Sequence, residues 1–300
     1  MSRDHDRRRH TERLAEVLAG TGGAEVPYPV GIRRLEVLRT GWLGSGLRRL
    51  TLGGPALAGF ESHVPDEHVR VIFPDPDGTV RLPERDGTRL SWPSPFPPSR
   101  EYTVRRHDAD TGELDLDVAV HGDGIGSAWA MSAAPGDPVH VAGPPGGLAV
   151  PQGYDRYLLA GDITALPAVA RWLERMPRTA RGWAFLEVGD ASEEIALSAP
   201  PGVDVSWVHR GDLAPGRDDG WERAIRSITV PDGERVYAWI AGEAGTIKPL
   251  RRWVRGELGL GRADSHVTGY WKLGTSFFDD DDDDDHHDHD HDHQEKEHDA

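Results

Sequence analysis

Residues 100–105 place an arginine, a tyrosine and a threonine at alternate or adjacent positions of a predicted strand. An arginine offers parallel donors to a pyrophosphate, an aromatic ring covers one face of an isoalloxazine, and a hydroxyl bonds a polar edge. Arg100, Tyr102 and Thr103, with Val104 continuing the strand, are therefore candidates for binding a flavin. An edge strand with a solvated arginine and a core tyrosine has the same pattern, so the segment alone leaves both interpretations open.

A second candidate site is a glycine-rich segment that precedes a predicted helix. Three glycines and a serine there bring backbone N–H groups within reach of a phosphate. The candidates are His121, Gly122, Gly124, Gly126 and Ser127. A glycine-rich turn is often only a turn, so this segment is not decisive by itself.

A third candidate is the strand-to-helix turn formed by residues 161–167, where a nicotinamide nucleotide could dock. It contains Gly161, Asp162, Thr164 and Ala165, and it is not a G-x-G-x-x-G fingerprint. Further on, His209 and Arg210 follow a predicted strand at the place where an adenosine ribose would lie, and Arg210 could grip a 2′-phosphate. A solvated loop arginine is the alternative there.

The C-terminal tail is a separate chemical feature. Seven consecutive aspartates (279–285) precede five histidines at His286, His287, His289, His291 and His293. The segment cannot bury apolar area, so we expect residues 279–300 to be disordered. Weak binding of transition metals by histidine and carboxylate is one interpretation, and a solubilising acidic tail is the other.

Composition excludes several classes of function. The 300 residues contain no cysteine, which rules out disulfides, a thiolate nucleophile and a cysteine-bound iron–sulfur cluster. Redox chemistry would therefore need a bound organic cofactor. The acidic tail carries much of the formal net charge of −17, and the acidic balance argues against nucleic acid. No apolar stretch is long enough to span a membrane, and the charged N-terminus does not resemble a secretory signal, so we expect a cytoplasmic protein.

Two kinds of secondary structure must position these residues. Up to about residue 150, short strands are separated by Gly and Pro, which suggests a small antiparallel β-barrel. Residues 114–120 alternate strictly between apolar and polar, as a half-buried strand does. After Pro151, strands alternate with helices, which predicts a parallel sheet covered by helices. A barrel followed by an α/β nucleotide-binding domain is the layout of ferredoxin-reductase-like flavoenzymes.

Five motifs occur in order along the chain: R-x-Y-T-V-R, H-G with G-x-x-S-x-W, G-D-x-T-A-L-P, W-x-A-G-E-A and G-Y-W-K-x-G. This order, over about residues 29–274, resembles the siderophore-interacting protein family. The resemblance implies an FAD-containing reductase that takes hydride from NAD(P)H and passes single electrons to a ferric siderophore, releasing Fe(II). Two departures are Gly124-Ile-Gly-Ser127, where the family often has Gly-Pro-Ala-Ser, and Ile163, where it often has an acidic residue.

The resemblance also implies residue roles, and the change of pattern near residue 150 sets the domain boundaries. Arg100, Tyr102 and Thr103 would hold the flavin, the segment from His121 to Ser127 would border its phosphates, and Gly242 and Glu243 would join Gly161 to Ala165 on the nicotinamide side. We expect a flexible basic arm over 1–24, for which a short helix is the alternative. An FAD-binding β-barrel domain over 25–150, an NAD(P)H-binding α/β domain with a C-terminal substrate segment over 151–278, and the tail follow.

An anionic iron complex needs a cationic entrance, for which Lys272, Arg251 and Arg252 are the candidates. The two arginines could equally be the solvated face of the last helix, and Lys272 a solvated lysine. Two other functions stay open: a flavin reductase that uses free flavin, a quinone or a redox protein as acceptor, and a metal-handling protein that acts through its tail. We expect a monomer or a weak dimer.

Overall fold

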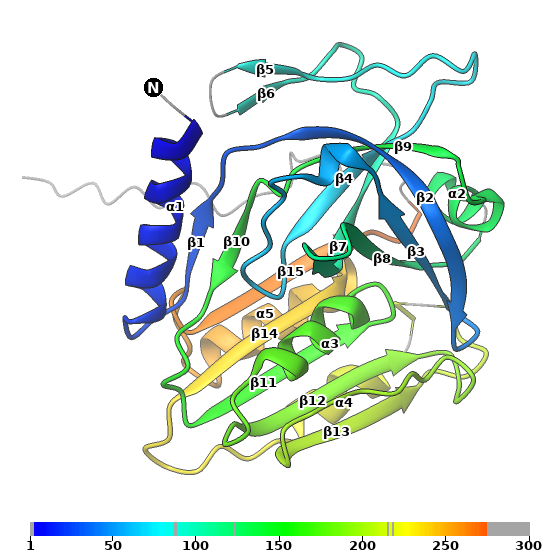
Figure 1. Ribbon diagram of the computed structural model, residues 1–300. Coiled ribbons are helices and arrows are strands. Elements are labelled where there is room, and N and C mark those ends of the chain that lie inside the picture. The colour runs from blue at the N-terminus through cyan, green and yellow to red at the C-terminus, as the bar shows by residue number, and fades with distance from the viewer. Residues whose placement is uncertain (1–2, 87–88, 123, 215, 218, 275–300) are drawn as a thin grey trace, which may run out of the picture.

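The computed structural model describes residues 3–86, 89–122, 124–214, 216–217 and 219–274. The chain forms a barrel in its first half and an open sheet in its second half, shown in the upper and lower parts of Figure 1. The predicted fold class, an antiparallel barrel followed by a parallel-sheet α/β unit, is confirmed. The predicted tail lies outside the described residues.

Six antiparallel strands close the barrel. Their order around it is β2 (Ile32–Leu43), β3 (Leu47–Gly53), β8 (Glu113–Ala119), β7 (Ser99–Asp108), β4 (His68–Ile72) and β9 (Pro138–Ala142). Alternate residues point inward and form one core, in which Leu50, Val69, Val104 and Leu116 are fully buried. Helix α2 (Ile125–Ser132) covers this core with Ala130 and Trp129.

Strand β8 differs from the half-buried strand that its alternation predicts. Its polar residues Asp115 and Asp117 are also buried, at 2% and 4% exposure. Arg106 Nε lies 2.8 Å from an Asp115 carboxylate oxygen, and Arg49 binds Asp117 through two bonds of 2.7 Å. These arginines neutralise the carboxylates and cover them, which is why the outward face of the strand is closed to water.

The second half is a five-stranded parallel sheet in the order β13 (Gly202–His209), β12 (Arg181–Val188), β11 (Arg156–Asp162), β14 (Val236–Glu243) and β15 (Ser265–Trp271). Helix α3 (Leu166–Arg175) packs on the sheet face nearer the barrel, and α4 (Gly220–Arg226) and α5 (Ala244–Gly256) pack on the other. The chain leaves β11 toward β12 and later returns to β14 on the opposite side. The strand order therefore reverses between β11 and β14.

Of the two alternatives for the N-terminal residues, a short helix or a flexible arm, the structure shows the helix. Residues Arg3–Leu18 form helix α1, and Leu14 and Val17 are buried at 5% and 6% exposure against Val26 and Tyr28. His10, Leu14 and Val17 lie on one helical face, a stripe too narrow to stand out among so many charges.

Two short strand pairs lie outside the barrel and the five-stranded sheet. β1 (Ala24–Pro27) pairs with β10 (Gly146–Ala149), and β5 (Glu84–Asp86) pairs with β6 (Arg89–Ser91) above the barrel in Figure 1. The segment before β1 also reaches the sheet, because Gly23 N donates to the Ala263 carbonyl at 2.7 Å and Arg235 donates to the Thr21 carbonyl. Within the described residues, no helix is long and apolar enough to cross a membrane.

Candidate functional site

The carboxyl ends of the parallel strands form one edge of the sheet, and the ends of β11 and β14 meet at the point where the strand order reverses. In open α/β sheets, ligands bind in the crevice at this point. Gly161 and Asp162 end β11, and Gly242 and Glu243 end β14. The residues predicted for the nicotinamide side therefore come together from two neighbouring strands.

Asp162 organises this crevice. One of its carboxylate oxygens accepts from Thr164 N at 2.9 Å and Thr164 Oγ1 at 2.6 Å, which holds the turn into α3. The other accepts from Trp271 Nε1 at 2.7 Å, across the intervening strand β14. A Cβ at Gly242 would lie 2.9 Å from this second oxygen, so the close approach requires glycine.

Three of the predicted nicotinamide residues have structural tasks here. Glu243 caps α5, accepting from Thr246 N at 2.8 Å, and also accepts from Leu273 N at 3.1 Å. Ala165 is fully buried, and a Cβ at Gly161 would lie 2.9 Å from its methyl group. Gly161 and Ala165 thus let α3 approach β11 closely.

The predicted flavin residues on β7 lie against the first turn of α2. A Cβ at Gly126 would lie 2.0 Å from the Tyr102 hydroxyl and 3.8 Å from Arg100 Cγ, so this glycine has no side-chain space. Burial raises the pKa of Tyr102 well above its usual value. The Arg100 guanidinium donates to the Ser99 carbonyl at 2.7 Å. An arginine side chain and the N–H groups of a helix N-terminus are both groups that bind a pyrophosphate. These residues therefore fit FAD.

The segment from His121 to Ser127 is held by its own serine. Ser127 Oγ accepts from His121 N at 3.0 Å and donates to the His121 carbonyl at 2.9 Å. Gly122 has a φ of 53°, a left-handed conformation that favours glycine. Ser127 thus shapes the loop, and the N–H groups at Gly124 and Gly126 start the helix. Val104 was predicted to contact the cofactor. It is instead fully buried in the barrel core.

The end of β15 joins the two sides of the site. The side chains of Tyr270 and Thr103 are hydrogen-bonded, and burial raises the pKa of Tyr270. The Trp271 ring lies 5.8 Å from the His121 ring. Tyr270 was absent from the predicted site, although the G-Y-W-K motif carried a signal for it. The aromatic pair places the barrel residues and Asp162 around one crevice.

The remaining predicted residues lie apart from this centre. His209 Nε2 is 2.7 Å from a Glu194 oxygen at the end of β13, and Arg210 follows it at the same edge of the sheet. Arg251 donates to the Val267 carbonyl at 3.0 and 3.1 Å from α5. Arg251 and Arg252 thus belong to the helix on the sheet face away from the barrel, whereas Lys272 directly follows Trp271 and is exposed. The five tail histidines lie outside the described residues.

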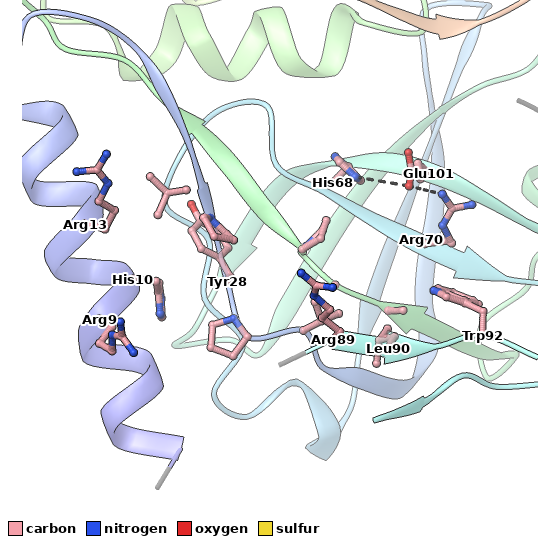
Figure 2. A pocket seen from close by; sticks show the side chains of 17 residues that line it. Arg9, His10, Arg13, Tyr28, His68, Arg70, Arg89, Leu90, Trp92 and Glu101 are labelled. Atoms are coloured by element: carbon pink, nitrogen blue, oxygen red, sulfur yellow. Dashed lines mark hydrogen bonds and ion pairs between the residues drawn. The ribbon is translucent and has the colours of Figure 1, made fainter. Parts of the chain in front are cut away.

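A cavity of about 690 Å³ lies on the outer side of β4 and β7, between α1 and the β5–β6 hairpin (Figure 2). Its titratable lining is almost entirely basic: Arg9, His10, Arg13, His68, Arg70 and Arg89, with Glu101 as the single carboxylate. Glu101 lies 2.5 Å from Arg70 and 3.6 Å from His68. Sequence reasoning missed this cavity, since three separate segments (α1, β4 and β6) supply its cations and none has a motif.

Glu101 stands between Arg100 and Tyr102 on β7, so the cavity adjoins the predicted flavin strand. Arg70 also lies over the rings of Trp92 and Phe96, 5.8 and 5.3 Å from their centroids. These contacts fix the guanidinium at the cavity wall. We call this feature the cationic cavity below.

Comparisons with known proteins agree with this geometry. Residues 36–148 match the siderophore-interacting FAD-binding domain, and residues 154–274 match the siderophore-interacting protein family. The chain is 35% identical to the ferric vibriobactin reductase ViuB of Vibrio cholerae over 251 residues, 82% of this chain and 90% of the relative. It is 34% identical to the NADPH-dependent ferric-chelate reductase of Escherichia coli over 224 residues, 73% of this chain and 85% of the relative.

Solved structures give the same result. A siderophore utilization protein from T. fusca superposes with a TM-score of 0.79 at 41% identity, covering 84% of this chain and 97% of that one. The siderophore-interacting protein SipS from Aeromonas hydrophila has a TM-score of 0.68 at 31% identity, covering 80% and 98%. With both halves matched and the crevice between them built from the shared motifs, this chain belongs to the siderophore-interacting protein family.

Proposed function

We propose that this protein is an NAD(P)H-dependent, FAD-containing reductase of ferric siderophores. The observation that carries the proposal is the cationic cavity beside the flavin strand. Siderophores bind iron through hard, anionic oxygens, so a cavity with several cations and one carboxylate suits such a complex. The names of the V. cholerae and E. coli relatives support the same substrate class.

The chemistry that bound FAD supplies is the conversion of two-electron hydride donation into the single-electron steps that ferric iron accepts. The residues on β7 and α2 would hold the group: Arg100 and the first N–H groups of α2 would bind the pyrophosphate, and Tyr102 and Thr103 would position the ring. Asp162, held by Trp271, shapes the crevice for the nicotinamide. Arg210, which follows β13 at the outer edge of the sheet, is our candidate for binding the 2′-phosphate of NADPH.

The domain assignment follows from these roles. We assign FAD binding to residues 25–150 and NAD(P)H binding to residues 151–278, with β15 contributing to both sites. Lys272 and the arginines of the cationic cavity attract the iron complex, and no protein ligand to ferric iron is required. We expect a monomer or weak dimer working in the cytoplasm, where NAD(P)H is available.

The test is a reduction and reoxidation experiment under argon with purified, flavin-loaded protein. NADPH or NADH should bleach the flavin absorbance, and an anionic ferric siderophore should restore it while an Fe(II)-specific chelator reports one Fe(II) per electron. Free flavin, a quinone and a redox protein are tested in parallel as acceptors. A flavin that one of these reoxidises much faster than the ferric siderophore would overturn the substrate assignment, and a colourless protein would overturn the flavin assignment.

The contribution of the cationic cavity is tested with Arg70→Gln, which removes one fixed cation. The KM for the anionic ferric siderophore should rise several-fold, while bleaching by NADPH stays unchanged. Arg34→Gln is the matched control, because Arg34 is an exposed arginine on β2 that does not line the cavity. Equal KM values for the two variants would show that the cavity does not receive the substrate.

A further inference from the structure

A group of metal-ligating side chains lies where α1 meets the barrel. Among the described residues, His10, Glu61 and His63 have one ligand atom each within 4.8 Å of the others. His10 Nε2 is 3.4 Å from a Glu61 carboxylate oxygen, and His63 Nε2 is 3.7 Å from the same oxygen. None of the three belongs to the flavin or nicotinamide crevice.

The distances suit a single transition-metal ion. Ligands bound to one ion at about 2.1 Å in tetrahedral geometry lie about 3.4 Å apart. Two of the three distances between the ligand atoms, 3.4 and 3.7 Å, are close to this value, and the third is at most 4.8 Å. Two imidazoles and one carboxylate are the ligand set that Fe(II) and Zn(II) accept, with coordination positions left for water or another ligand.

An unsatisfied atom points to the same conclusion. The His63 Nε2 atom is buried and has no hydrogen-bond partner among the described residues. A buried polar atom without a partner is costly, and a bound cation would satisfy it. His10 is itself 6% exposed, although histidine on a charged helix is ordinarily solvated.

The segment that carries the ligands is held in place by Glu67. This fully buried carboxylate accepts from His63 N at 2.6 Å, Val64 N at 2.9 Å, Ser62 Oγ at 2.6 Å and Tyr28 Oη at 3.0 Å. Arg175 on α3 donates to the His63 carbonyl at 2.5 Å. Such outer contacts fix ligand direction before an ion arrives.

The charge around the group is mixed, because Arg9 and Arg13 flank His10 on α1 and Arg175 donates to the His63 carbonyl. The nearest buried arginine, Arg171, lies 3.7 Å from Glu67, which balances it. The centroid of the buried Tyr28 ring lies 5.1 Å from that of His10 and 5.4 Å from that of His63, so Tyr28 packs against both imidazoles. Glu61, at 39% side-chain exposure, leaves a path for the ion.

We propose that His10, Glu61 and His63 form a binding site for a divalent first-row transition-metal ion that fastens α1 to the barrel. His10 and Tyr28 also line the cationic cavity, so the site opens beside the place assigned to the iron complex. If the proposed function holds, the Fe(II) released in the cationic cavity is an ion that this site can bind. Reductase activity and metal binding are nevertheless separate properties, because the ion takes part in no electron transfer here.

The test uses the full chain and hydrogen exchange, because a local readout separates this site from the tail histidines. Zn(II) should slow exchange of the backbone amides in residues 3–18 at least several-fold in the wild type. Glu61→Gln keeps the size of the side chain and removes the charged ligand, so this slowing should disappear. His140→Gln is the control, since His140 lies on β9 away from the group, and it should behave as the wild type.

A second measurement locates the ion directly. Crystals soaked in Zn(II) should show an anomalous peak between the three side chains in the wild type and none there in Glu61→Gln. Fe(II) added under argon should give the same protection of α1. No protection of α1 by Zn(II), or equal protection in Glu61→Gln, would overturn the site, and protection by Zn(II) but not by Fe(II) would overturn the Fe(II) assignment.

Reductase turnover of Glu61→Gln is measured alongside and should match the wild type. Absence of turnover in both proteins together with the expected Zn(II) result would refute the proposed function and leave the metal site standing. His63→Gln provides a second variant with the same expected loss, so a folding defect in one variant does not decide the outcome.

Discussion

The Arg100 side chain lies beside the first turn of α2, with its Cγ 3.8 Å from the Cβ position of Gly126, and its guanidinium donates to the Ser99 carbonyl at 2.7 Å. Charge-assisted contacts of this kind are about twice as strong as neutral ones. The position of Arg100 at this turn is a property of the fold, since the strand and the helix are separated by β8 in the chain.

Arg100→Ala should therefore weaken FAD binding by about 1.5–3 kcal/mol, which is roughly ten- to a hundredfold in Kd. The measurement is titration of flavin-stripped protein with FAD, followed by flavin fluorescence. Arg34→Ala on β2 should leave the Kd unchanged. Wild-type affinity in the Arg100 variant would remove this residue from the flavin site.

Lys272 is the second residue with a specific expectation. It is exposed directly after Trp271, which bonds to Asp162 and packs near His121. Its compact ammonium on a flexible stem suits ferric complexes of varied shape better than a rigid guanidinium.

Lys272→Ala should raise the KM for an anionic ferric siderophore several-fold and leave flavin content and hydride uptake unchanged. The effect should shrink as salt is added, because an exposed charge is screened over about 10 Å at 0.1 M. Arg252→Ala is the matched control, since α5 lies on the other side of the sheet. Superimposable kinetics for wild type and Lys272→Ala at low salt would show that Lys272 does not guide the substrate.

Single residues were predictable where a motif fixes both the residue and its neighbours. Asp162 and Tyr102 lie in the crevice region because strand ends and strand register place them. Val104 and Arg251 do not, because the sequence does not reveal which side of a strand or helix faces the ligand. A one-residue step along a strand turns the side chain to the opposite face.

At the scale of elements, the segment from Glu61 to Glu67 connects the barrel to α3 and β1. Glu67 joins them through Tyr28, Ser62 and a close approach to Arg171, whose side chain is 3% exposed. Removing one partner of a buried ion pair leaves the other charge without compensation.

Glu67→Gln should lower the free energy of unfolding by about 3–5 kcal/mol. The midpoint of urea unfolding measures it. Glu174→Gln breaks the partly exposed pair with Arg105, where Glu174 is 40% exposed, and should cost at most about 1 kcal/mol. Similar midpoints for the two variants would mean that Glu67 does not hold these elements together.

Helices and strands with regularly spaced apolar residues were predictable from the sequence. Short strands that form only because they pair with another segment were not. The strands of the barrel and the helices α3 and α5 follow their periods, and Leu166, Val169 and Leu173 are buried as α3 requires. β1 and β10 are four residues long and exist because they pair with each other. β15 contains Gly269 and has no fully buried residue, so its sequence carries little strand signal.

At the scale of the whole molecule, the tail and the folded part should bind metal separately. Deleting residues 279–300 should leave the fold and flavin content unchanged and reduce bound Zn(II) from several ions to about one, because the tail histidines supply the weak sites. Calorimetry on the two proteins gives the number of sites. Undiminished binding by the truncated protein would show that the tail histidines do not bind the metal.

The general architecture was accessible from sequence because the rhythm of strands and helices changes near residue 150. The cationic cavity was not, since α1, β4, β6 and β7 contribute to it and only the tertiary structure brings them together. The His10, Glu61 and His63 group was hidden for the same reason.

The hydrogen bond between Gly23 and Ala263 also has a consequence for synthesis on the ribosome. These two residues are 240 positions apart, so at 5–20 residues per second Ala263 is added roughly 12–48 s after Gly23. The barrel strands and the β1–β10 pairing can form while the nascent chain grows, whereas the contact between the N-terminal segment and the sheet must wait. The contact of Gly23 with the sheet therefore forms only after Ala263 has been synthesised.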